Sequence, residues 1–256
     1  MARRLVVTSG KGGVGKTTVA AMLGACLAKK GERVILCDAD FGLNSLDVFC
    51  GVEGLVTYDI VDVIEGKCRA KQALVKHPFF PNLYILTSRR QDGEKYVSAQ
   101  ALKLVLDGLQ EEFDYVIVDS PAGLEDGFHR AVAPCGEAIV VTAPYLAAIR
   151  DADKTVTLLK KYALEKVWLV VNRVQGDLVL CGKQLSAEEI GEVLKTPLIG
   201  VIPDDYCLPI AGADYLSRPF KLLGETVRTG KVRLCDPTKK YSGFFGALKR
   251  SLKRRL

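Results

Sequence analysis

The sequence lacks the features that mark several large functional classes. It has no run of about 20 apolar residues, so no segment is predicted to cross a bilayer. None of its eight cysteines pair as C-x-x-C, and with only two histidines in 256 residues they make no zinc-binding pattern. Only three apolar residues follow Arg3 and Arg4, too few for a signal peptide. We therefore expect a cytosolic protein with scattered, reduced and mostly buried cysteines.

Net positive charge is missing from most of the chain. The net charge is +6, but residues 239–256 alone contain seven lysines and arginines and no acid, which leaves the other 238 residues at −1. A protein that coats nucleic acid would carry positive charge over its folded body. We therefore expect no specific binding to nucleic acid.

Short apolar runs alternate with longer segments of helical periodicity. They predict strands at residues 4–9, 33–40, 82–88, 115–123 (running into a loop), 138–144, 167–173 and 198–203, and helices at residues 17–31, 57–66, 98–113, 149–164 and 186–195. The strands are continuous apolar runs rather than alternating ones, which is typical of strands buried on both faces of a parallel sheet. We expect an α/β fold with a three-layer, doubly wound, mostly parallel sheet over residues 1–235. Residues 236–256 are predicted to be a linker and a C-terminal amphipathic helix.

A glycine-rich stretch, SGKGGVGKTT at residues 9–18, joins the first predicted strand to the first predicted helix. It matches the phosphate-binding motif G-x-x-x-x-G-K-[ST]. Glycines let consecutive backbone N–H groups point at phosphate oxygens, and the positive end of the helix faces the same anion. The motif lysine reaches the phosphates, and the threonine hydroxyl suits Mg²⁺. The predicted site for ATP and Mg²⁺ comprises Gly10, Lys11, Gly12, Gly13, Val14, Gly15, Lys16, Thr17 and Thr18.

The lysine directly after the first glycine is not part of the general motif. With Lys11, the stretch KGGVGKTT resembles the deviant Walker A family of ATPases. In that family the extra lysine reaches across a dimer to the partner's nucleotide, where a second cation compensates charge on the transferring phosphoryl group. The resemblance implies an ATP-dependent homodimer in which Lys11 and Lys16 are catalytic.

Acidic residues stand at the ends of two predicted strands. Because the carboxyl ends of parallel strands meet at one edge of a sheet, we expect these acids beside the phosphate loop. By the resemblance, Asp119 holds Mg²⁺ through water, and Gly123 is a switch II glycine near the γ-phosphate. Asp40 resembles the switch I aspartate that positions or activates the attacking water, and Asp38 would order the water shell of the metal. For Asp119 the alternative is an acid that only terminates its strand.

Two later segments complete the nucleotide pocket by resemblance alone. Asn172, in VVNRV, would read the edge of the adenine, with turn capping as its alternative role. Pro203 and Asp204, in GVIPDD, would pack on the base.

Longer runs resemble the MinD branch of this family, whose members are ATPases that place the bacterial division septum. Among these runs are DADFGLNSLDVFCGVE, EEFDYVIVDSPAGLEDGF and IRDADKTVTLL. The resemblance implies three kinds of partner: a division inhibitor, MinC; a topological factor, MinE or a DivIVA-linked system; and anionic membrane lipid. Asp151 and Asp153 are candidate docking residues, with helix capping as the alternative. The sequence departs from the branch at FGLNSLD and TAPYLAAIRDADK, which puts partner recognition in doubt more than hydrolysis.

Several other functions are alternatives to placement of the division septum. Flagellar-number regulators generally carry an N-terminal extension, for which a first strand near residue 4 leaves no room. A ParA-like DNA-segregation ATPase would need a basic body. The nitrogenase iron protein holds a cluster through cysteines, and residues 120–128 contain none. A binding switch with negligible turnover would share every motif and stays open.

The chain ends in YSGFFGALKRSLKRRL. On a helix, the aromatic and leucine side chains share one arc and most of the basic ones share the other, which is typical of a helix lying in a membrane interface. Two glycines disfavour this helix in water, so we expect it to form only on lipid. A helix packed on its own domain and a basic nucleic-acid arm are the alternatives. The predicted membrane contacts are Phe244, Phe245, Leu248, Lys249, Arg250, Leu252 and Lys253.

Overall fold

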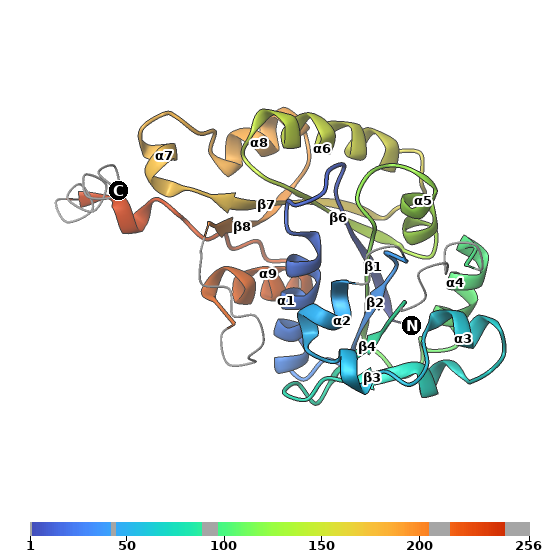
Figure 1. The fold of residues 1–256 in the computed structure, drawn as a ribbon. Helices are drawn as coiled ribbons and strands as arrows, with labels where there is room; N and C mark the ends of the chain where they lie inside the picture. The colour runs from blue at the N-terminus through green and yellow to red at the C-terminus, as the bar shows by residue number, and fades with distance from the viewer. Residues whose placement is uncertain (1, 42–44, 89–96, 205–215, 244–256) are drawn as a thin grey trace.

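One sheet organises the chain. The computed structural model describes residues 2–41, 45–88, 97–204 and 216–243. In this part of the chain eight strands pair in the order β3-β4-β2-β5-β1-β6-β7-β8 (Figure 1). All pairs are parallel except β3 with β4, which confirms the predicted doubly wound, mostly parallel fold. The strands are β1 (Arg3–Thr8), β2 (Val34–Asp38), β3 (Leu74–Lys76), β4 (Leu83–Leu86), β5 (Tyr115–Asp119), β6 (Glu137–Thr142), β7 (Lys166–Val174) and β8 (Leu198–Pro203).

Helices cover both faces of the sheet and make the three layers. One apolar cluster joins the sheet to α1 (Lys16–Lys29), α2 (Ser45–Cys50) and α9 (Arg218–Thr229). A second cluster, on the other face, joins it to α3 (Ile60–Ile64), α4 (Ala99–Asp107), α5 (Asp126–Val132), α6 (Leu146–Leu159) and α8 (Ala187–Leu194). The remaining elements are α7 (Gly176–Leu180), directly after β7, and the 3₁₀ turns η1 (Glu53–Leu55), η2 (Ala70–Ala73) and η4 (Lys239–Tyr241).

The central strands face apolar side chains on both sides. Along β1, Leu5 and Val7 belong to the cluster with α1, and Val6 belongs to the opposite one. Every residue of β2 and β5 is buried. Successive side chains of a strand point to opposite faces, and helices cover both faces of this sheet. These strands are therefore apolar up to the aspartates that end β2 and β5.

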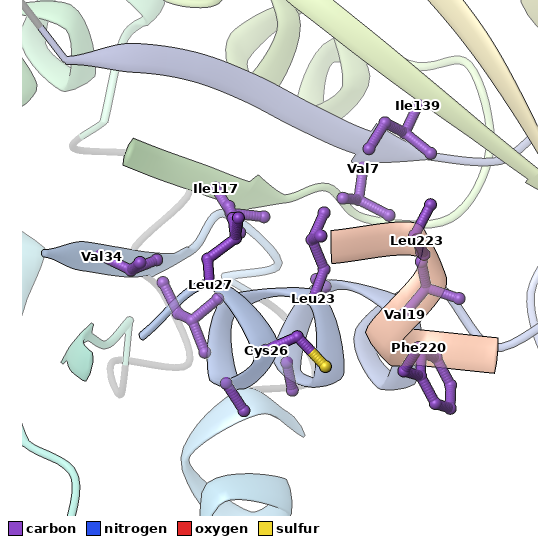
Figure 2. Close-up of a cluster of buried hydrophobic side chains, with 14 of the residues drawn as sticks. Val7, Val19, Leu23, Cys26, Leu27, Val34, Ile117, Ile139, Phe220 and Leu223 are labelled. Carbon is purple, nitrogen blue, oxygen red and sulfur yellow. The ribbon is translucent and has the colours of Figure 1, made fainter. Parts of the chain in front are cut away.

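Helices α1 and α9 pack side by side against one face of the sheet. Figure 2 shows this cluster, which includes Val7, Val19, Leu23, Leu27, Ile117, Phe220 and Leu223. A Cβ atom at Gly224 of α9 would lie 2.9 Å from the Cβ of Cys26, so glycine permits this close approach. Helix α9 has 12 residues, with Pro219 in its first turn and Gly230 (φ 74°) after its end.

Several element boundaries differ from the prediction. Ser98 caps α4, since its hydroxyl accepts a hydrogen bond from the Ala101 N–H (3.1 Å). The same helix ends at Asp107 rather than at residue 113, and α2, α5, α7, α9 and β3 were not predicted. Of the seven cysteines in the described ranges, all are free but only Cys26, Cys37 and Cys50 are buried, so the expectation of mostly buried cysteines was wrong.

The described start of the predicted linker packs on the domain. Tyr241 is only 7% exposed, and a Cβ atom at Gly176 in α7 would clash with the carbonyl oxygen of Pro237. The Asp236 carboxylate accepts hydrogen bonds from the Thr238 N–H (2.9 Å) and hydroxyl (2.6 Å), which closes a turn between them. The predicted membrane contacts from Phe244 to Lys253 lie outside the described residues. Within the ranges that are described, no helix is long and apolar enough to span a membrane.

Candidate functional site

The phosphate loop and the acidic strand ends meet at the carboxyl edge of the sheet. β1 leads into residues 9–15, and α1 begins at Lys16. The adjacent strands β2 and β5 end in register, with Asp38 opposite Asp119. Strand order therefore places β5 and its Asp119 between the loop-bearing strand β1 and Asp38.

The loop adopts a backbone that requires glycine. Gly13 (φ 79°) and Gly15 (φ 94°) are both in the left-handed region. A Cβ atom at Gly15 would also clash with the side-chain amide of Asn172. Since α1 starts immediately after Gly15, its free N–H groups and its positive dipole end face the space enclosed by the loop.

The two lysines of the loop have opposite surroundings. Lys16 is 8% exposed, whereas Lys11 lies on the surface. The Nζ atom of Lys11 sits 5.7 Å from the ring centroid of Tyr145, which immediately precedes α6. Lys16 is thus held within its own chain, and Lys11 is available to a second molecule. Tyr145 is a neighbour that the sequence reasoning missed.

Neighbouring elements fix the loop. The Ser9 hydroxyl donates to the Lys11 carbonyl (2.7 Å), and the Asn172 side-chain amide donates to the Val14 carbonyl (2.8 Å). The other side of that amide accepts a hydrogen bond from the Arg173 N–H (2.9 Å). A Cβ atom at Gly10 would clash with the backbone carbonyl of Asp151, so α6 lies directly against the loop. The loop is therefore preorganised before any phosphate binds.

The donor set beside Lys16 suits Mg²⁺. The Thr17 hydroxyl hydrogen-bonds to the Asp119 carboxylate and lies 3.5 Å from the Ser45 hydroxyl. Asp119 Oδ1 is buried and has no hydrogen-bond partner among the described residues. An orphaned carboxylate oxygen next to a hydroxyl offers the hard oxygen ligands that Mg²⁺ prefers. Within the same ranges no group of three acidic, cysteine or histidine side chains could hold a metal ion.

Burial dominates the protonation of the two strand-end acids. It raises the pKa of Asp119 to about 6, against the hydrogen bond from Thr17 and the charge of Lys16, with Asp40 adding to the rise. Burial and the neighbouring charge of Asp119 raise the pKa of Asp38 well above its usual range. A divalent cation would relieve both effects.

Asp38 organises the chain that follows β2. Its carboxylate accepts hydrogen bonds from the backbone N–H groups of Asp40 (2.9 Å) and Leu46 (3.4 Å). Asp40 itself is half-buried, and its carbonyl accepts a bond from the Ser88 hydroxyl (3.4 Å). Asp38 thus positions the backbone that carries Asp40; a role in ordering metal-bound water stays a prediction.

The predicted base-side residues gather where β7 and β8 end. Asn172 lies on β7, and Pro203 is the register partner of Val174. The Asp204 N–H donates to the Val174 carbonyl (3.0 Å). Gln175, which the sequence reasoning missed, donates from Nε2 to the Asp204 carboxylate (2.9 Å).

The remaining predicted residues have distinct positions. Gly123, four residues past Asp119, has a φ of 93° that favours glycine. The Asp151 carboxylate pairs with Lys154 (3.1 Å), and its carbonyl accepts a bond from the Thr155 hydroxyl (2.8 Å). Asp153 is exposed on α6, so it is the more accessible of the two candidate docking acids.

We predict that Asn172→Asp weakens ATP and GTP binding by the same factor, about 10-fold or more. The change turns the donor that faces the Val14 carbonyl into an acceptor, which leaves a buried group unsatisfied whichever base is bound. Titrating both nucleotides with fluorescent analogues measures this. A loss confined to ATP would instead support adenine recognition by Asn172.

A second prediction concerns pH. Asp119 binds its proton more tightly in the folded chain than in the unfolded chain. Its contribution to the free energy of unfolding therefore falls as pH rises from about 4 to about 6. Between pH 5 and pH 7 in EDTA, the parent should lose about 1 kcal/mol of unfolding free energy relative to Asp119→Asn. Urea denaturation at both pH values measures it. The exposed control Asp153→Asn should follow the parent, and parallel curves for all three proteins would contradict the assignment.

Known proteins are similar to this chain in both sequence and fold. Residues 5–217 match the family described as the CobQ/CobB/MinD/ParA nucleotide binding domain. The chain is similar to the septum site-determining protein MinD of Synechocystis sp., with 45% identity over 205 residues, 80% of this chain and 77% of that protein.

Two solved structures resemble the fold closely. One is the MinC:MinD cell division protein complex of Aquifex aeolicus, with a TM-score of 0.82 and 34% identity over 91% of this chain and 98% of that chain. The other is the septum site-determining protein MinD of Pyrococcus horikoshii OT3 complexed with Mg-ADP, with a TM-score of 0.79 and 29% identity over 90% of this chain and 97% of that chain.

Proposed function

Because the chain belongs to the CobQ/CobB/MinD/ParA family of nucleotide-binding proteins, and within it to the septum site-determining MinD proteins, we propose that it is an ATP-driven dimerisation switch that regulates placement of the division septum. Its cofactors are ATP and Mg²⁺. The reaction is hydrolysis of ATP by water to ADP and phosphate.

The observation that carries the proposal is the contrast between the two loop lysines. Lys16 is buried against Asp119 and serves the nucleotide of its own chain. Lys11 belongs to the same loop but is exposed, with its Nζ atom near the Tyr145 ring. A cation in that position can compensate charge on a nucleotide held by a facing copy. Hydrolysis would then require two chains.

The residues of the site divide the chemistry between them. The loop N–H groups and Lys16 bind and orient the phosphates, and Thr17 and Asp119 would hold Mg²⁺, which neutralises phosphate charge. Asp40, positioned through the Asp38 carboxylate, would orient or deprotonate the attacking water. Lys11 of the facing chain would complete the site.

The C-terminal tail would bind the membrane, with a strength that depends on dimerisation. One amphipathic segment binds anionic lipid weakly and reversibly. Two tails on one dimer would strengthen attachment by roughly 10²–10⁴-fold, because the second binds at high effective concentration. ATP-driven dimerisation would therefore become attachment to the inner face of the cell membrane, and hydrolysis would become release.

Partners are proposed from the relatives. The Aquifex aeolicus protein forms a complex with MinC, so we propose a MinC-type division inhibitor as the partner of the ATP-bound dimer. The exposed start of α6, with Asp153, is the proposed docking surface. A MinE or DivIVA-linked factor is the proposed source of spatial control.

We predict that Lys11→Ala retains ADP binding but does not dimerise with a non-hydrolysable ATP analogue. Turnover should fall about 10²–10³-fold, because the cation facing the partner's nucleotide is gone. Sedimentation velocity and a phosphate-release assay measure the two effects. Lys30→Ala, which removes an exposed lysine at the other end of α1, is the control. A Lys11→Ala protein that dimerises like the parent would rule out the trans-acting lysine.

The membrane proposal predicts that truncation after Gly243 abolishes co-sedimentation with anionic vesicles in ATP and leaves dimerisation intact. This end point keeps Tyr241, which packs on the domain. The parent should sediment far more in ATP than in ADP, and Phe245→Glu should behave as the truncation does. Equal sedimentation in ATP and in ADP would contradict the proposed dependence of membrane attachment on dimerisation.

A further inference from the structure

An arginine on α5 contacts the segment that carries the switch I aspartate. The guanidinium carbon of Arg130 lies 5.3 Å from the ring centroid of Phe41, the residue that follows Asp40. Phe41 is fully buried in the second core cluster. α5 begins seven residues after Asp119, at the end of the loop that carries Gly123. The contact therefore joins the element after switch II to the residue after Asp40.

The surroundings of Arg130 give it no other described role. Its Nη1 atom is buried and has no hydrogen-bond partner within the described ranges. A buried guanidinium N–H without an acceptor is unfavourable, and no hydrogen bond between described residues offsets the burial of this atom. Among the described residues, Arg130 makes a cation–π contact with the face of the Phe41 ring.

Asp40 lies between two attachments to the switch II side. On one side, the Ala39 N–H donates to the Asp119 carbonyl (2.9 Å). On the other side, Phe41 is covered by Arg130. Inside this span the Asp40 N–H is bound to the Asp38 carboxylate (2.9 Å). The backbone attachment is made within the sheet edge, whereas the side-chain attachment adds the Arg130 contact from α5 to the packing of Phe41 in the second core cluster.

We propose that Arg130 is a positioning residue that clamps Phe41 to α5 and so fixes Asp40 relative to switch II. Its effect on hydrolysis rests on the proposed function, because Asp40 acts there on the attacking water. Its effect on the switch I backbone does not, since both residues of the contact belong to the same chain.

Amide hydrogen exchange in the nucleotide-free chain tests the clamp directly. In Arg130→Met, exchange in a peptide spanning residues 38–41 should accelerate about 10-fold, in line with the strength of a partly desolvated cation–π contact. A peptide from β6 should be unchanged. Arg130→Lys, which keeps the cation but not the planar group, should lie between the parent and Arg130→Met. Arg228→Met, the same change at an exposed position on α9, is the matched control and should exchange like the parent.

Steady-state kinetics give the second readout. At saturating ATP, Arg130→Met should lower kcat about 10-fold, while its Kd for ADP stays within about twofold of the parent. Combining it with Phe41→Leu should add little to either single change, since both remove the same contact. Arg228→Met should leave kcat unchanged.

Two results would overturn the clamp: unchanged exchange in residues 38–41 of Arg130→Met, or equal acceleration in every peptide, which would indicate general destabilisation. A parent chain without turnover would refute the proposed hydrolysis and leave the exchange experiment to decide on Arg130. Accelerated exchange with parental kcat would show that Asp40 needs no positioning by Arg130, which also contradicts the proposal.

Discussion

The rest of the site depends on the burial of a carboxylate at the end of β5. Asp119 lies between the phosphate loop and Asp38, is shielded from water, and keeps one oxygen without a described partner. Water cannot solvate this charge, and neither Thr17 nor Lys16 prevents the rise in its pKa. The folded chain therefore carries an unfavourable electrostatic interaction at its carboxyl edge that a divalent cation would remove. For this reason the carboxyl edge of the sheet would favour Mg²⁺ bound together with a phosphate.

Preorganisation of the loop follows from what surrounds it rather than from its own sequence. Its glycines permit the backbone conformation, but β7 and α6 hold it there through the Asn172 amide and the close approach of Asp151 to Gly10. Lys16 is buried near the Asp119 carboxylate, and Lys11 is exposed beside Tyr145. In the proposed function, this single loop would present one cation to the nucleotide of its own chain and another to a second molecule.

The predicted base-side residues and the C-terminal segment meet at the start of α7. Gln175 binds Asp204 on the base side, and the next residue, Gly176, packs against Pro237 of the C-terminal segment. Tyr241 then anchors that segment on the domain. A tail that begins beyond this anchor is attached beside the base-side residues rather than to a free linker, so it starts from a defined point on the protein surface.

The sequence by itself determined the alternation of strands and helices, the phosphate loop and the acids at the ends of β2 and β5. These features depend on local patterns: apolar runs, helical periodicity, and a glycine motif whose spacing is set by the backbone. Short elements such as α2, α7 and β3 escaped prediction because a few residues carry too little periodicity and are stabilised by their neighbours.

Only the tertiary structure decided which distant residues meet. The Asn172 amide reaches Val14 across 158 positions, and Arg130 covers Phe41 from another layer of the fold. Local propensity carries no information about such pairs, because the order of strands and the packing of helices bring them together. The same reason explains Tyr241: its place in the chain suggests a membrane-facing residue, and its burial against the domain shows a structural anchor.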